Sequence, residues 1–206
     1  MRLDAETNMK HLALLAAHLL AACGSETQTP VAPVAEAPAP AATPAPKSDA
    51  LTATGWGPLR IGMSRAEVIA AAGDTKTPDA TGIPGSDCLE FQPAQAPDGL
   101  WVMIESDRLT RITIGDLSTV KDASGLGLGD TAAKVKETHG GQVQVSPHKY
   151  QDAPAEYIAV WQGGPRAEPF VEDADARGLI YEIDGTGTVG AIHAGGPSIQ
   201  YVEGCA

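Results

Sequence analysis

The chain has few positively charged residues. Its 206 residues include 14 lysines and arginines against 26 aspartates and glutamates, which gives a net charge of −12 at pH 7. A protein that binds nucleic acid needs a basic face for the phosphates, and this composition does not supply one. We therefore expect no nucleic-acid partner. An acidic surface of this kind favours solubility or a basic protein partner.

Signatures of catalysis and of metal binding are also missing. The sequence contains no Gly-x-Ser-x-Gly motif, no His-Glu-x-x-His motif and no phosphate loop. Neither Cys88 nor Cys205 has a second ligand at zinc spacing, and the acidic run at 168–175 lacks the spaced aspartates and glycine of a calcium loop. The sequence thus predicts a protein that is not an enzyme and that has no cofactor and no metal.

Long apolar runs are scarce as well. The apolar segment at residues 12–19 is shorter than the roughly 20 residues that a membrane-spanning helix needs. A charged start, a short apolar segment and small residues before a cleavage point are typical of a secretory signal, which we expect over residues 1–22. The Leu-Ala-Ala-Cys box that ends at Cys23 resembles the bacterial lipoprotein signal. This resemblance implies that Cys23 is acylated and anchors the protein to a membrane; the alternatives are an ordinary signal peptide and a true start at Met9.

Residues 23–50 are rich in alanine and proline and cannot bury enough surface to fold, so we interpret them as a tether. The folded domain is expected over residues 51–206. Export to an oxidising compartment leaves Cys88 and Cys205 as the other two cysteines, and we expect a disulfide between them. It would tie the carboxyl end of the chain to the first half of the domain. The alternative is two buried free thiols.

The folded part is organised around residues 59–73. An apolar strand-like entry and a glycine turn lead to Ser64 and Glu67, which form a capping box at the start of a helix. Gly73 suits the residue that ends such a helix. Alternating apolar residues and turn signals then predict three strands. These strands are expected at residues 88–91, 100–105 and 109–114.

The same pattern returns 67 residues later. Residues 126–135 match residues 59–68, with Thr131 at the cap position and Gly140 at the end of the helix. Internal repetition of this kind outweighs any single propensity, so the second copy is also expected to be a helix followed by three strands. We expect strands at 156–161, 179–183 and 188–192, an insertion at 163–177 and a final strand in the tail at 198–205.

The predicted fold is therefore α+β, with two tandem α-β-β-β repeats at residues 55–118 and 122–206 and short helices packed on antiparallel sheet. The run Ile-Gly-Met-Ser-x-x-Glu-Val-x-x-x-x-Gly at 61–73, on its tether, resembles the SmpA/OmlA (BamE-like) small outer-membrane lipoproteins. Two units in tandem are similar to the beta-lactamase inhibitory protein, which presents a concave sheet to its protein target. The resemblance implies an outer-membrane protein that faces the periplasm. Asp74 replaces the proline usual in that family, so we carry over the fold and no specific partner.

Aromatic residues make up only 4 % of the chain, and most lie in or beside expected strands. On an open sheet such residues anchor a protein partner or provide stacking platforms for a glycan, although each is often a core residue instead. The candidate binding residues are Trp101, Tyr157, Trp161 and Tyr181.

Three functions are compatible with the sequence. The first is a non-catalytic, lipid-anchored envelope module that binds a protein, and the alternative is a lectin-like domain that binds a glycan or the cell wall. An envelope hydrolase is the third. An exposed aromatic patch on the open sheet face would favour the first, and a groove with aromatics beside Asp, Asn or Arg the second. Clustered, perturbed titratable groups in a cleft would favour the third.

Overall fold

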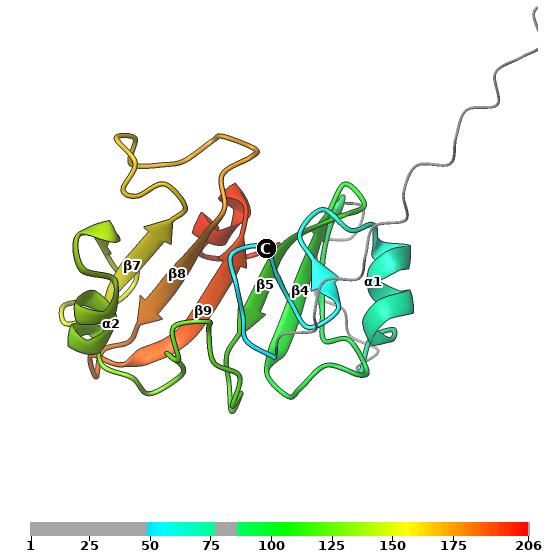
Figure 1. Ribbon diagram of the computed structural model, residues 1–206, viewed down its shortest axis with the longest axis horizontal. Helices are drawn as coiled ribbons and strands as arrows, with labels where there is room; N and C mark the ends of the chain where they lie inside the picture. Colours follow the sequence, from blue (N-terminus) through cyan, green and yellow to red (C-terminus); the bar gives the residue numbers. More distant parts are fainter. Residues whose placement is uncertain (1–48, 77–85, 206) are drawn as a thin grey trace, which may run out of the picture. The chain divides into compact units, whose positions relative to one another are not determined.

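The computed structural model describes residues 49–76 and 86–205. The signal peptide, Cys23 and nearly all of the tether lie outside the described residues. Within them, two short α-helices lie against a mostly antiparallel sheet, as Figure 1 shows, so the α+β class is confirmed. None of the helices in these two ranges is long and apolar enough to span a membrane.

Seven strands form one sheet in the order β3-β4-β5-β9-β8-β7-β6, with every neighbouring pair antiparallel. The last strand of the first half of the chain, β5, therefore pairs with the last strand of the second half, β9. The strands are β3 (Cys88–Phe91), β4 (Leu100–Glu105), β5 (Arg108–Ile114), β6 (Val143–Pro147), β7 (Glu156–Trp161), β8 (Gly178–Ile183) and β9 (Val189–Gly195). A separate two-stranded sheet consists of β1 (Gly55–Trp56) and β2 (Leu59–Arg60).

The helix caps agree with the sequence pattern. Before α1 (Arg65–Ala72), the Ser64 side chain accepts from the Glu67 N–H and the Glu67 carboxylate accepts from the Ser64 N–H, which completes the capping box. Before α2 (Ala132–His139), Thr131 accepts from the Lys134 N–H alone. Each helix thus starts where its cap residue predicts.

Both helices are attached to the sheet in the same way. The Gly62 N–H donates to the Leu109 carbonyl and the Leu109 N–H donates to Met63, at 2.8 and 2.7 Å. In the second half the Gly129 N–H donates to the Val189 carbonyl and the Val189 N–H donates to Asp130, at 2.9 and 2.8 Å. The turn before each helix therefore makes the same two backbone bonds to β5 or to β9.

The tail does not add the strand that the sequence suggested. Residues Pro197–Gln200 form the 3-10 helix η2, and turns follow at residues 202–205. Proline lacks an N–H for a strand ladder but suits the first turn of a helix, and Pro197 occupies that position. The structure instead adds an edge strand that was not expected, β6, which pairs with β7.

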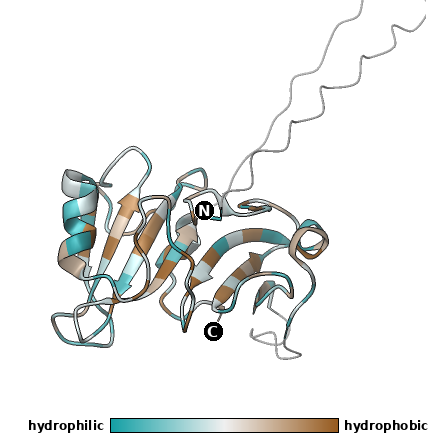
Figure 2. Ribbon diagram, turned by 60° about the horizontal axis from the view of Figure 1, so that its bottom comes forward, coloured by the Kyte–Doolittle hydropathy of each residue, from teal (hydrophilic) through white to brown (hydrophobic). Residues whose placement is uncertain are grey.

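The two faces of the sheet have different environments. Side chains alternate between the faces along each strand, and the resulting bands of apolar and polar residues can be followed in Figure 2. One face packs against the helices and forms the main core, which includes Val68 of α1, Val135 of α2, Ile112 and Ile192. We call the opposite face the tail face, because the insertion, η2 and the carboxyl tail contact it.

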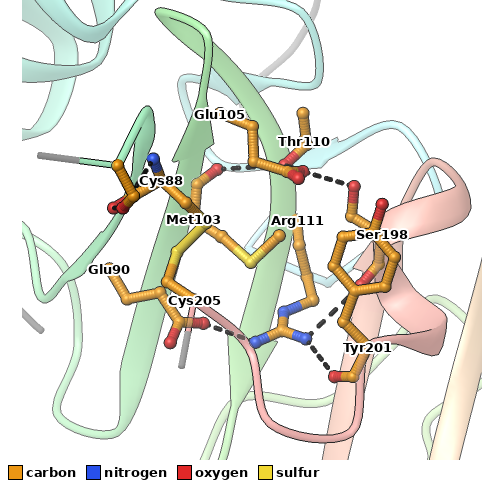
Figure 3. The surroundings of a disulfide bond; sticks show 10 residues. Cys88, Glu90, Met103, Glu105, Thr110, Arg111, Ser198, Tyr201 and Cys205 are labelled. Atoms are coloured by element: carbon orange, nitrogen blue, oxygen red, sulfur yellow. Dashed lines mark hydrogen bonds and ion pairs between the residues drawn. A yellow bond between two sulfur atoms is a disulfide. The ribbon is translucent and has the colours of Figure 1, made fainter. Parts of the chain in front are cut away.

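Cys88 and Cys205 are joined by a disulfide, in agreement with the sequence-based pairing (Figure 3). Beside it, the buried Arg111 guanidinium forms an ion pair with Glu90 and donates to the Tyr201 carbonyl at 2.8 Å. Ser198 of η2 and Thr110 of β5 both donate to the Glu105 carboxylate. The disulfide and these polar bonds hold the tail on the first half of the sheet.

Reduction of this disulfide should destabilise the domain. The bond links residues 117 apart, and in the chain-entropy account a loop of that length contributes about 4 to 5 kcal/mol. Urea unfolding of the folded domain with and without reductant measures this loss. A double variant, Cys88→Ser with Cys205→Ser, is the control and should not respond to reductant. A wild-type midpoint that reductant leaves unchanged would favour two free thiols.

Candidate functional site

The tail face carries a row of side chains across the junction of the two halves. The register places Trp101, Thr113, His193 and Ile180 opposite one another on β4, β5, β9 and β8. Residues in register on neighbouring strands lie on the same face of a sheet. Thr113 and His193 are therefore the central pair of the row, one from each half.

A chain of hydrogen bonds runs from this pair into the second half. Thr113 Oγ1 lies 3.0 Å from His193 Nδ1, and His193 Nε2 lies 3.3 Å from Glu182 Oε2. The other carboxylate oxygen, Oε1, lies 3.1 Å from His148 Nε2. We call Thr113, His193, Glu182 and His148 the polar chain. It links β5, β9, β8 and the loop that follows β6.

The hydrogen-bond partners of each histidine show which of its ring nitrogens carries the proton. His148 Nδ1 accepts the backbone N–H groups of Tyr150 and Gln151, both at 3.1 Å, so Nε2 carries the proton donated to Glu182. A carboxylate only accepts, so His193 Nε2 also donates to Glu182 and its Nδ1 accepts from the Thr113 hydroxyl. Glu182 is thus held by two imidazole N–H groups.

Burial and these bonds shift the pKa values of His193 and Glu182. Burial lowers the pKa of His193, although its hydrogen bond to Glu182 acts in the opposite direction. The hydrogen bond from His193 is the largest cause that lowers the pKa of Glu182; burial opposes it and the bond from His148 adds to it. We infer an ionised Glu182 beside a neutral His193 near neutral pH.

The order hydroxyl, imidazole, carboxylate is also the order of a hydrolytic triad. Thr113, however, lies inside the sheet with β4 on one side and β9 on the other. Backbone N–H groups of an interior strand are committed to its ladders, so they do not form an oxyanion site beside Thr113. We interpret the polar chain as a structural connection between segments.

The four candidate aromatic residues differ in burial and in the face of the sheet on which they lie. Tyr181 is fully buried on the helix-covered face, where its hydroxyl donates to Asp122 and lies 2.8 Å from His139 Nε2. Tyr181 is therefore not exposed to a partner, and it lies on the face opposite to its neighbour Glu182 in β8. Trp161 is 4 % exposed and belongs to a small second core under the insertion. Trp101 and Tyr157 are half-buried on the tail face.

Apolar residues that the sequence did not single out form an exposed patch. The rings of Phe170 and Tyr201 stack with their centroids 6.4 Å apart, and Val202 follows Tyr201. Phe170 is 45 % exposed, and Tyr201 and Val202 are each 39 % exposed. We call these three residues the aromatic patch. Gln200 joins its two segments, because its side-chain amide bonds both the N–H and the carbonyl of Val171 at 2.9 Å.

A pocket of about 180 Å³ lies next to the aromatic patch. Phe170 and Val202 line it together with Tyr157, Trp161 and Ile180. The Tyr157 ring stacks on His148 with centroids 4.7 Å apart, so the polar chain supports one wall of the pocket. Two amide side chains line the pocket, and both already have partners. Gln200 bonds Val171, and Gln144 accepts from the Arg166 N–H at 3.2 Å.

Acidic side chains surround this region. The insertion that carries Phe170 also contains four exposed carboxylates, and Glu203 follows Val202. These four residues are Glu168, Glu172, Asp173 and Asp175. The aromatic patch therefore lies in negatively charged surroundings.

Two of these features could have been suspected from the sequence. Thr113 and His193 lie 80 residues apart, the same offset that relates Leu109 to Val189. A glutamate between two apolar strand residues on β8 likewise indicates the polar side of that strand. Phe170, by contrast, lies in an insertion without periodicity, and only the fold brings it to Tyr201.

No protein-family model, curated protein or solved structure matches this chain. The resemblance to the SmpA/OmlA lipoproteins therefore stays a prediction. Among residues 49–76 and 86–205, no group of three or more His, Cys, Asp or Glu side chains is placed to hold a metal ion.

The polar chain predicts a fold that weakens in mild acid. A histidine with a lowered folded pKa takes up its proton more readily when unfolded, so its contribution is lost as the pH falls below about 6.5. Glu182 adds a further loss below about pH 4.5, since its pKa is also lowered in the folded state. We expect the free energy of unfolding, from urea titrations, to be lower at pH 5.5 than at pH 7.5.

His193→Gln should reduce this pH dependence, because the glutamine side chain does not titrate. Burial also lowers the pKa of His139, so the single variant retains part of the effect and His193→Gln with His139→Gln removes more. A wild-type domain that is equally stable at both pH values would contradict the assignment of a neutral, buried His193.

Proposed function

We propose that the protein is a non-catalytic, lipid-anchored module of the bacterial cell envelope that binds another protein through the aromatic patch. The observation that carries the proposal is the gathering of Phe170, Tyr201 and Val202, all exposed, beside a side-chain-sized pocket. Exposed aromatic residues around a pocket are typical anchors of protein interfaces. The lipoprotein box at Cys23 supports the anchor and the location at the outer membrane facing the periplasm.

The pocket favours a protein over a glycan. Its volume of about 180 Å³ is below the 300 Å³ or more of usual small-molecule sites, but it suits one apolar side chain of a partner. A sugar needs free hydrogen-bonding groups beside the aromatic rings. The Gln144 and Gln200 amides are occupied within the protein instead, although the Tyr157 hydroxyl of the same lining has no hydrogen-bond partner among the described residues.

The charges beside the patch indicate the partner's chemistry. Carboxylates at Glu168, Glu172 and Glu203 lie in the same segments as Phe170 and Val202. Complementary charge steers association and selects partners. The proposed partner therefore presents an apolar side chain flanked by lysine or arginine, and raised salt should slow its association.

We also propose that the two halves are tandem repeats of one α-β-β-β unit. Equivalent turns before α1 and α2 make the same pair of backbone bonds to β5 and β9. The members of the central pair, Thr113 and His193, also occupy equivalent positions, 80 residues apart. Antiparallel pairing of equivalent residues is expected where a pseudo-twofold axis passes between two copies.

The decisive variant is Phe170→Ala. Truncation of a central aromatic anchor usually weakens an interface by 2 kcal/mol or more, so we expect at least about a tenfold loss of affinity. Cross-linking and pull-down with the lipid-anchored protein in its native envelope identify the partner, and titration calorimetry with the purified partner measures the loss. Tyr201→Ala should act in the same direction.

Leu117→Ala is the matched control, because Leu117 is a 91 % exposed apolar residue outside the aromatic patch. It should bind like the wild type. Unchanged thermal unfolding of each variant excludes misfolding as the cause. The proposal fails if the recovered protein binds Phe170→Ala as tightly as the wild type, or if polysaccharide alone is recovered.

A further inference from the structure

A second pocket lies on the tail face and is lined by residues of both halves. Its volume is about 350 Å³, within the range of sites for small molecules. The first half contributes the Gly62 turn and Arg108 at the start of β5, and the insertion contributes Arg177 and Glu172. Residues in and on either side of η2 also line it. They are Gly196, Pro197, Ser198 and Tyr201.

The two arginines of this pocket have no carboxylate partner among the described residues. Arg108 Nη1 donates to the Gly62 carbonyl at 3.3 Å, and Arg177 Nη1 donates to the carbonyls of Ala174 and Ala176 at 2.8 and 2.7 Å. A guanidinium has five N–H groups, so Nη2 and Nε of each arginine keep their donors for another acceptor.

Among the arginines that the structure describes, Arg111 alone forms an ion pair with a carboxylate, that of Glu90. Arg60, Arg65 and Arg166 resemble Arg108 and Arg177 in having no such partner, so what distinguishes Arg108 and Arg177 is that they line one pocket together. Arg108 acts on Glu67 only from a distance: the bonds from Ser64 are the larger causes of that residue's lowered pKa, and the charge of Arg108 is the smallest. Two guanidiniums that keep N–H donors for another acceptor therefore line one pocket, where together they can bind an anion.

We propose that this pocket binds a small organic carboxylate. Arg177 is held by two backbone carbonyls, which fixes its guanidinium, and guanidinium groups bind carboxylates through two parallel N–H···O bonds. Arg108 provides the second positive charge. Glu172 faces the same space, so two arginines and one glutamate leave the lining with a net formal charge of +1.

The pocket does not depend on the proposed protein interface. It shares Tyr201 with the aromatic patch but uses neither Phe170 nor the smaller pocket. Its ligand would be a free metabolite-sized acid, since Glu172 and the acidic insertion disfavour a large anionic partner. This inference goes beyond the protein-binding function and can be tested separately.

Succinate is the probe, and succinamide is its uncharged counterpart of the same length. Titration of the folded protein with succinate at constant ionic strength should produce saturable calorimetric heat and shifts in the amide NMR signals of the pocket residues. Succinamide should produce neither. Equal responses to both compounds, or no response to succinate, would overturn the proposal.

Three charge variants should change the affinity for succinate in different directions. Arg177→Gln and Arg108→Gln should each weaken succinate binding, the former by about tenfold, since a charge-assisted bidentate contact is lost. Glu172→Gln should strengthen it, because a repelling carboxylate is removed. Arg65→Gln removes the same charge from an exposed position of α1 outside the pocket and should have no effect.

The same variants separate this inference from the protein-binding proposal. Phe170→Ala should leave succinate binding unchanged while it weakens the protein partner. Glu172→Gln should strengthen succinate binding but weaken a basic protein partner. Succinate binding that responds equally to Arg65→Gln and Arg177→Gln reflects general charge and would contradict a site at this pocket.

Discussion

The pairing of β5 with β9 is the contact on which the sheet depends, and it requires a glycine. Gly195 lies opposite Arg111 in this ladder with a φ of 148°. A Cβ at Gly195 would lie 2.2 Å from the Thr110 carbonyl oxygen, a distance that no side chain tolerates. Any larger residue would therefore separate the two strands. Because β5 and β9 are the only neighbours that connect the two halves in the strand order, such a separation would divide the sheet.

The polar chain follows from this pairing. Once β5 and β9 are in register, Thr113 and His193 must lie side by side on the tail face, and η2 and the insertion cover that region. A covered imidazole needs partners for both nitrogens, and Thr113 and Glu182 supply them. Glu182 in turn holds His148, which stacks on Tyr157. The polar chain thus connects the pairing of β5 and β9 to Tyr157, which lines the smaller pocket.

Features that depend on neighbouring residues were predictable from the sequence. The caps at Ser64 and Thr131, the turn glycines and the alternation of the strands are local signals, and the corresponding helices and strands formed where expected. The hairpin between β4 and β5 is tighter than expected. Ser106 and Asp107 both have positive φ, which allows a two-residue turn before Arg108.

Apart from the Cys88–Cys205 disulfide, which the number of cysteines indicated, features that depend on contacts between distant segments were not predictable. Alternation gives the two faces of a strand but does not say which face the helices cover, so it could not show that Tyr181, a candidate binding residue, is buried under them. Phe170 and Tyr201 lie far apart in the sequence and meet because the insertion and the tail pack on the same face. The hydrogen bonds between the Gln200 amide and the Val171 backbone hold the two segments together, and no sequence pattern at either residue indicates this contact.

The contrast between local features and contacts of distant segments also bears on the proposed function. The groups that recur in both halves, such as the caps and the turns before the helices, make their hydrogen bonds within the fold. Several exposed or incompletely bonded groups lie in segments without a counterpart in the other half: the insertion, with Phe170 and Arg177, and the tail, with Tyr201. Arg108, at the start of β5, is an exception. Since a fold must satisfy its own polar groups before it can bind, we propose that binding takes place mainly where the two halves differ. Both proposed sites accordingly include residues of the insertion and the tail on the tail face.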